Sequence, residues 1–178
     1  MDIIVLLANI LQNLAISLGV GCSTLAILNF FVAIADGKID ETERNMMGIV
    51  YTVLRVAMIL IFITTVIIFS NSTIVNGFSS VTIYLYAQVL LTYVLFANSI
   101  LMTRHLMPST IGPALQASSW YSLGLISTLA AVGLQAFTLT QFLLGYLAAF
   151  LLAVSLVNGT MAYLKSKKQS AREAETVG

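Results

Sequence analysis

The sequence predicts an all-α integral membrane protein, a five-transmembrane-helix bundle with its N-terminus outside the cell and its C-terminus in the cytoplasm. The first observation is composition: 59% of the 178 residues are hydrophobic and only 8% are charged, whereas about a quarter of a soluble domain is charged. The second is the length of the charge-free stretches Ile3–Ala35, Val56–Thr103 and His105–Leu164. At roughly 20 apolar residues per crossing, the first holds one helix and each of the others holds two.

The third observation is the distribution of basic residues. Five crossings place the N-terminus, the second loop and the fourth loop on one face, where the sequence has no Lys or Arg. The opposite face receives every basic residue except Arg55, namely Lys38, Arg44, Arg104, Lys165, Lys167, Lys168 and Arg172. Because cytoplasmic loops carry the excess of positive charge, this face is predicted to be cytoplasmic.

The first two spans are predicted at 3–35 and 46–69. The first is long enough to tilt or to project beyond the bilayer. Its small residues Gly19 and Ser23 stand four apart, a spacing that allows close approach of another helix. The small polar residues of Ser70–Ser80 are predicted to form the turn that follows the second span.

The remaining spans are predicted at 81–103, 115–137 and 142–164, which completes a single transmembrane domain over residues 1–164. Pro108 and Pro113 are expected to break the helix between the third and fourth spans. A short turn, Thr138–Gln141, is expected to lead into the fifth. Residues 165–178 form a basic-then-acidic cytoplasmic tail, and its far end is expected to be disordered.

The first loop, Ala35–Arg44, admits two interpretations. Asp40 and Glu43 have the spacing of a capping box, in which the N-cap side chain and the N3 side chain each accept a backbone hydrogen bond. The same residues resemble the second half of a calcium-binding loop, but the earlier ligand positions fall on Val32 and Ile34, which offer no carboxylate. The helix cap is the favoured interpretation.

This region also carries a resemblance. The segment LGVGCSTLAILNFFVAIADGKIDETER looks like the opening of small uncharacterised prokaryotic membrane proteins, with a Gly-rich first helix and a DGxIxxxE turn. The later ANSILMTRHLMPSTIGP is similar to their segment that ends in a proline loop. The resemblance implies a location in the prokaryotic inner (plasma) membrane and implies no activity.

Arg55 is the residue that composition does not explain, because it lies inside the second apolar span. If the span begins at Met46, Arg55 lies about 13 Å into it, close to the bilayer midplane. A charge there costs about 2.5–3.5 kcal/mol on insertion scales. The side chain could snorkel toward the cytoplasm. It could instead line a polar cavity and bind an anionic group, or meet an acidic residue of a partner protein.

Polar residues predicted to share the depth of Arg55, or to line a vestibule above it, are the candidate ligand-binding set. None of them is acidic, so an anion from outside the chain could complete the pair with the guanidinium. On the first helix, Asn9, Gln12, Asn13 and Ser17 form a stripe that could line a vestibule opening outward, with Arg55 at its floor. The stripe could equally form interhelical hydrogen bonds with no cavity. The candidate set is Arg55, Asn13, Ser23, Thr24, Gln88, Thr92, Tyr93, Asn98, Ser122, Ser155 and Asn158.

The predicted function is non-enzymatic: an inner-membrane binding or assembly protein that holds a lipid or a partner helix, with Arg55 as a buried anion anchor. The alternative is a permeation protein for a small anion or metabolite. We expect no catalytic residue, metal or cofactor, because the spans contain no Asp or Glu and the chain has one histidine and one cysteine. Expected partners are membrane lipids and a membrane protein or a second copy of the chain, and not nucleic acid.

Overall fold

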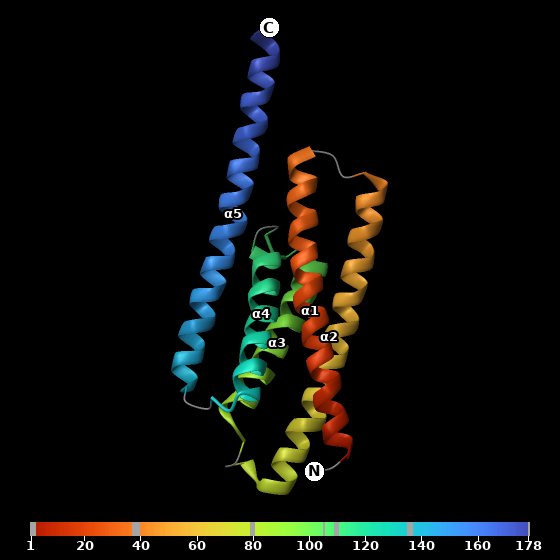
Figure 1. Cartoon of the computed structure of the whole chain (residues 1–178), viewed down its shortest axis with the longest axis vertical. Coiled ribbons are helices and arrows are strands. Elements are labelled where there is room, and N and C mark those ends of the chain that lie inside the picture. The colour runs from red at the N-terminus through yellow and green to blue at the C-terminus, as the bar shows by residue number, and fades with distance from the viewer. Residues whose placement is uncertain are drawn as a thin grey trace.

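The fold is an all-helical bundle. The computed structural model describes residues 3–36, 40–78, 81–104, 106–108, 111–134 and 137–177, which form five helices and no strand. These are α1 (Ile3–Asp36), α2 (Glu41–Asn76), α3 (Ile83–Thr103), α4 (Ile111–Ala131) and α5 (Leu139–Val177). Consecutive helices run in opposite directions (Figure 1). Four of them, α1, α2, α3 and α5, are long and apolar enough to cross a membrane, which indicates a membrane protein.

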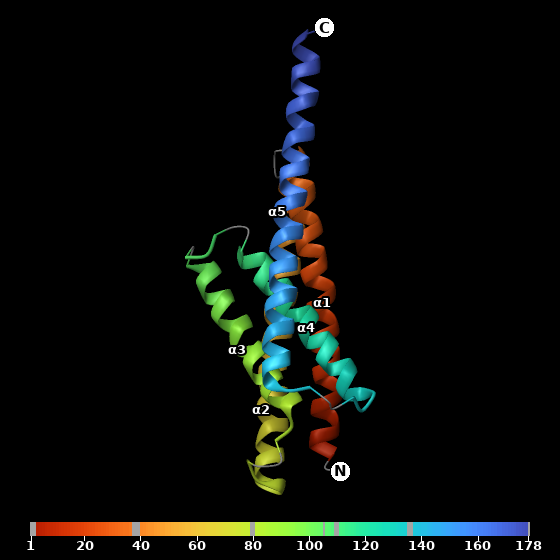
Figure 2. The ribbon, with the colours of Figure 1, turned by 90° about the vertical axis from the view of Figure 1, so that its left-hand side faces the viewer.

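The core lies where α1, α2, α3 and α4 meet, and it is centred on Trp120. The indole is fully buried, and the same apolar cluster contains Ile61, Leu91 and Leu123. Trp120 packs directly on the backbone of Gly19, where any Cβ would overlap the indole ring. Helix α5 contacts α4, α1 and α3 but has no contact with α2 among the described residues. Of the four helices that could cross a membrane, α5 is the least buried, and it stands in front of the others in Figure 2.

Helix α2 is longer than the predicted span 46–69 at both ends. It begins at Glu41 with the predicted capping box, which the structure confirms: the Glu43 amide donates to Asp40 Oδ1 at 2.6 Å and the Asp40 amide donates to Glu43 Oε2 at 3.1 Å. The predicted turn over Ser70–Ser80 is wrong for residues 70–76, which stay helical. The Thr73 hydroxyl donates back to the carbonyls of Phe69 and Ser70, and the helix ends only at Gly77, whose φ is +77°.

Helix α4 is shifted toward the N-terminus relative to the predicted span 115–137. Pro113 does not break the helix but occupies its first turn. A backbone N–H in the first turn has no intrahelical acceptor, so the missing N–H of proline costs nothing there. The helix ends at Ala131 because Gly133 adopts a φ of +73°, and the Leu134 amide donates back to the Leu129 carbonyl.

Helix α5 is also longer than predicted. Thr138 and Gln141 form a second capping box, in which each side chain accepts the other's backbone amide, so the helix begins at Leu139. The chain continues as helix to Val177, through the part of the tail for which disorder was expected. This extension projects beyond the other helices (Figure 1).

Candidate functional site

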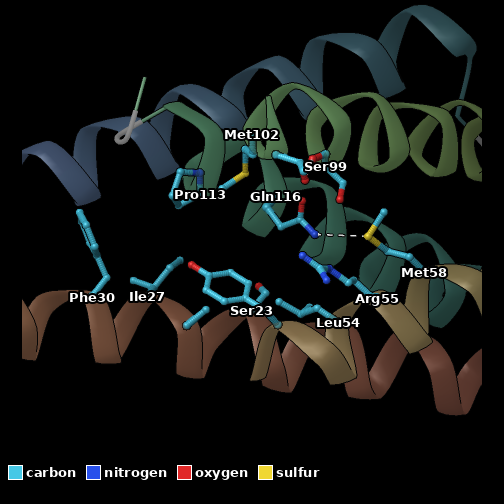
Figure 3. A pocket seen from close by; sticks show the side chains of 13 residues that line it. Ser23, Ile27, Phe30, Leu54, Arg55, Met58, Ser99, Met102, Pro113 and Gln116 are labelled. Carbon is cyan, nitrogen blue, oxygen red and sulfur yellow. Dashed lines mark hydrogen bonds between the residues drawn. The ribbon is translucent and has the colours of Figure 1, made fainter. Parts of the chain in front are cut away.

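A cavity of about 240 Å³ lies between α1, α2, α3 and α4, and Arg55 lines it. Ser23 and Phe30 come from α1, Ser99 and Met102 from α3, and Gln116 from α4. Figure 3 shows the Arg55 side chain extending from α2 toward Gln116, with Ser23 and Leu54 nearby. Two residues of the predicted set, Arg55 and Ser23, therefore share one cavity, as their common depth on neighbouring antiparallel helices predicts.

Among the residues that the structure describes, Arg55 is the only charged one that lines this cavity, and its side chain is exposed, whereas a buried anchor was predicted. It makes no hydrogen bond or ion pair with any part of the chain that the structure describes. Beside it, Ser23 is 2% exposed, and its hydroxyl has no hydrogen-bond partner among the described residues. A cation without a carboxylate and a buried donor without an acceptor both favour an acceptor-rich, anionic group in the cavity.

The depth of Arg55 follows from its neighbours on α3 and α4. Helix α3 has 21 residues and is therefore about 31 Å long, close to the thickness of a bilayer core. The cavity is lined by Ser99, Met102 and Thr103 from the last two turns of α3 and by Pro113 from the first turn of α4. Arg55 thus lies level with the end of α3 and the start of α4, and α1 and α2 project beyond α3 and α4 at this end (Figure 1).

Asn98 lies behind the cavity wall and positions a residue that forms it. Asn98 is 1% exposed, and its amide donates to the Gly112 carbonyl at 2.9 Å and to Gln116 Oε1 at 3.2 Å. The Gln116 amide faces Met58 Sδ at 3.7 Å. The Asn98 bonds therefore tie α3 to α4 and fix the Gln116 side chain next to Arg55. Asn98 was in the predicted set; Gln116 was not.

A second cavity, of about 280 Å³, lies at the opposite end of the bundle between α1, α3 and α4. Asn13 and Gln88 of the predicted set line it, together with Asn9 and Gln12 of the polar stripe. Arg55 does not line this cavity, and the predicted single vestibule with Arg55 at its floor is replaced by two separate cavities. The packed residues around Gly19 and Trp120 lie between them.

A third feature is an apolar groove of about 310 Å³ between α2 and α3. Thr92 and Tyr93 of the predicted set line it, beside Phe62, Val66 and Phe96. The Thr92 hydroxyl donates to the Gln88 carbonyl within its own helix, which leaves the groove surface mainly aromatic and aliphatic.

The other predicted residues line none of these three cavities. Thr24 bonds to the hydroxyl of Tyr121 at 2.7 Å, and Ser122 is buried in α4. Ser155 and Asn158 are exposed on α5, which does not reach α2, so the structure does not bring them to Arg55. They were predicted to lie near Arg55 from their position along the fifth span alone. That position says nothing about the direction in which a side chain points from its helix.

The Arg55 cavity is also lined by Gln116, Tyr51 and Ser99, which were not in the predicted ligand-binding set. Tyr51 is one helical turn from Arg55, a spacing that puts two residues on the same face of a helix. Ser99 follows Asn98 directly. Gln116 could have been found as the only amide side chain in the predicted fourth span besides Gln135.

Comparison with known proteins adds no further constraint. No protein-family model, curated protein or solved structure matches the chain. The resemblance to small prokaryotic membrane proteins therefore stays a prediction, and the functional argument depends on the geometry of the cavities.

Proposed function

We propose that this chain is a non-enzymatic inner-membrane protein that binds an anionic phospholipid, with the lipid phosphate held by Arg55. The observation that carries the proposal is the Arg55 guanidinium, which lines a cavity of about 240 Å³ without a carboxylate among the lining residues. A lipid phosphate supplies the missing negative charge. The depth of a lipid phosphate in the bilayer also agrees with the position of Arg55 near one end of the bundle, where headgroups lie.

The residues around Arg55 have the chemistry that a phosphate requires. A guanidinium presents parallel N–H donors that match two phosphate oxygens. Ser23 offers a buried hydroxyl without a partner, and Tyr51 and Ser99 bring further hydroxyl groups to the same cavity. These neutral donors favour a singly charged phosphate, such as a phosphodiester, over an apolar ligand.

The apolar groove lies along the same faces of α2 and α3 as the Arg55 cavity. On α2, Phe62 and Val66 follow Arg55 by seven and eleven residues, so all three lie on one face of the helix. On α3 the corresponding stripe is Ser99, Phe96, Thr92 and Val89. A headgroup in the cavity would therefore place an acyl chain against Phe62 and Phe96, whose rings meet edge to face at 5.5 Å.

The proposal includes five crossings, with the N-terminus outside and the C-terminus in the cytoplasm. Helix α4 adds a fifth crossing to those of α1, α2, α3 and α5. It can cross because its polar residues face other helices: Ser118, Ser119 and Ser122 are all buried. Arg44 and Arg104 stand at the end of the bundle where the α1–α2 and α3–α4 connections lie. By the positive-inside rule this end is cytoplasmic, so the lipid site faces the inner leaflet.

Transport of the anion is not part of the proposal, because a packed layer that includes Trp120, Ile61 and Leu91 lies between the two cavities. The expected role is retention of a lipid within an assembly, with a second copy of the chain or another membrane protein as partner. Basic residues at the start of the α5 extension, such as Lys167, would add attraction to anionic headgroups of about 1 kcal/mol per nearby charge.

Native mass spectrometry of the protein released from gentle detergent tests the proposal. Wild type is expected to carry a phospholipid adduct, and Arg55→Ala is expected to lose most of it because the phosphate loses its charged donor. Arg44→Ala is the matched control: it removes the same charge from the same helix, about three turns earlier, outside the cavity. It should keep the adduct.

Three results would contradict lipid binding at Arg55. One is wild type without a lipid mass in protein extracted from its native membrane. The second is an equal adduct on wild type and Arg55→Ala. The third is an adduct that Arg44→Ala removes as effectively as Arg55→Ala, which would mean that the lipid is attracted by general positive charge.

A further inference from the structure

The cavity at the opposite end of the bundle is polar but uncharged. Its polar lining residues are Asn9, Gln12, Asn13, Tyr84, Gln88 and Ser127. No Lys, Arg, Asp or Glu is among the described residues that line it, in contrast to the cavity of Arg55. An ion entering this cavity would lose hydration without gaining a counter-charge, so the lining selects against charged ligands.

A single hydroxyl fixes two of these amides. Thr65 Oγ1 accepts a hydrogen bond from Gln12 Nε2 at 3.1 Å and one from Gln88 Nε2 at 3.4 Å. Thr65 lies on α2, outside the cavity, and draws both NH2 groups away from it. The carbonyl oxygens of Gln12 and Gln88 accept no hydrogen bond from the described residues, so both remain as acceptors for a ligand.

The donors come from the same two helices, Tyr84 from α3 and Asn13 from α1. The Tyr84 side chain is 7% exposed, and its hydroxyl has no partner among the described residues. The ring is held by Phe137, which it meets edge to face with centroids 4.8 Å apart. At the rim, Asn13 Oδ1 accepts from the Ser127 hydroxyl at 2.6 Å, which leaves the Asn13 NH2 group as a donor. An unpaired buried hydroxyl is costly, and a ligand that accepts a hydrogen bond from it removes that cost.

We propose that this cavity binds a small uncharged polyol or sugar. Adjacent hydroxyl groups each donate and accept, so they can satisfy the two glutamine carbonyls and accept from Tyr84 and Asn13 at once. A hydrocarbon would leave all four groups unpaired, and an anion or cation would lack a counter-charge. The site is independent of the lipid site, because it shares no lining residue with the cavity of Arg55.

Saturation-transfer NMR of the full chain in nanodiscs tests this, with glucose as the probe and gluconate as an anion of similar size. Wild type should transfer saturation to glucose and not to gluconate. Tyr84→Phe removes one hydroxyl and keeps the ring on Phe137, and it should weaken the apparent affinity for glucose about tenfold. Tyr86→Phe is the matched control, since Tyr86 is exposed on the same helix and does not line the cavity.

Gln88→Met provides a second variant that removes an acceptor while keeping side-chain length, and it should weaken glucose binding by a similar factor. Four outcomes would overturn the proposal. One is wild type without a glucose signal, which would leave water as the occupant. The others are equal signals from glucose and gluconate, equal affinity in wild type and Tyr84→Phe, and a loss in Tyr86→Phe that matches the loss in Tyr84→Phe.

Discussion

At the scale of single residues, Gly19 shows how closely the helices of this bundle pack. Between apolar helices in lipid there is little hydrophobic driving force, and van der Waals contact takes its place. The missing side chain of Gly19 lets the Trp120 ring lie directly against the α1 backbone. Two residues later, Gly21 has no atom within 4 Å of the position that a Cβ would occupy. The same residue type therefore has opposite roles at two neighbouring positions.

Gly19→Ala is expected to destabilise the bundle by about 1–3 kcal/mol, because the new methyl group overlaps a rigid indole that is buried on all sides. Gly21→Ala should be neutral or stabilising by up to about 1 kcal/mol, since alanine favours the helix and meets no obstacle. Thermal unfolding in detergent, followed by Trp120 fluorescence, measures both. Equal stability of the two variants would mean that the contact with Trp120 contributes little.

At the scale of elements, helix ends depend on local hydrogen bonds, and these differ in how well the sequence predicts them. The box of Asp40 and Glu43 was predicted because its residue types and spacing specify it. The continuation of α2 through Thr73 was not, because a serine- and threonine-rich segment fits a turn as well as a helix. The Thr73 hydroxyl bonds back to carbonyls of the same helix, which satisfies this polar group without a turn.

Asp40→Ala tests the best defined of these ends. The loss of an N-cap costs about 1 kcal/mol, so hydrogen exchange at the first-turn amides of α2 should accelerate about fivefold. Exchange measured by mass spectrometry on peptides that cover residues 41–48 reports this. Glu41→Gln changes an acid in the same turn that makes no capping bond and should leave exchange nearly unchanged. Comparable acceleration in both variants would point to the helix dipole instead of the cap.

The candidate site was predictable in depth but not in direction. Hydropathy and charge place residues along a helix axis, and on that basis Arg55 and Ser23 were correctly expected at one level. Which way a side chain points depends on how each helix is rotated against its neighbours. Gln116 faces Arg55 because the Asn98 bonds hold α3 against α4, and hydropathy and charge do not reveal that contact. Ser155 and Asn158 are exposed on α5, which has no contact with α2 among the described residues.

At the scale of the whole molecule, the two ends of the bundle differ in chemistry. One end combines Arg55 with the basic residues Arg44 and Arg104, and the other presents an uncharged cavity of amides and hydroxyls. A packed layer around Trp120 lies between them. Opposite faces of a membrane meet different solutes and lipids, so this asymmetry is useful only if the bundle has one fixed orientation.

The orientation and the number of crossings can be tested together with single cysteines in a Cys22→Ser background. Val75→Cys and Val132→Cys lie at the end of the bundle where α1 begins, and Ser166→Cys lies on the α5 extension. With five crossings and the N-terminus outside, a membrane-impermeant maleimide should label the first two on intact cells and Ser166→Cys only after permeabilisation. If α4 did not cross, the result for the last two would be reversed: Val132→Cys would be protected and Ser166→Cys would be labelled. Labelling of Ser166→Cys alone would instead indicate five crossings in the opposite orientation, which would place the Arg55 cavity in the outer leaflet.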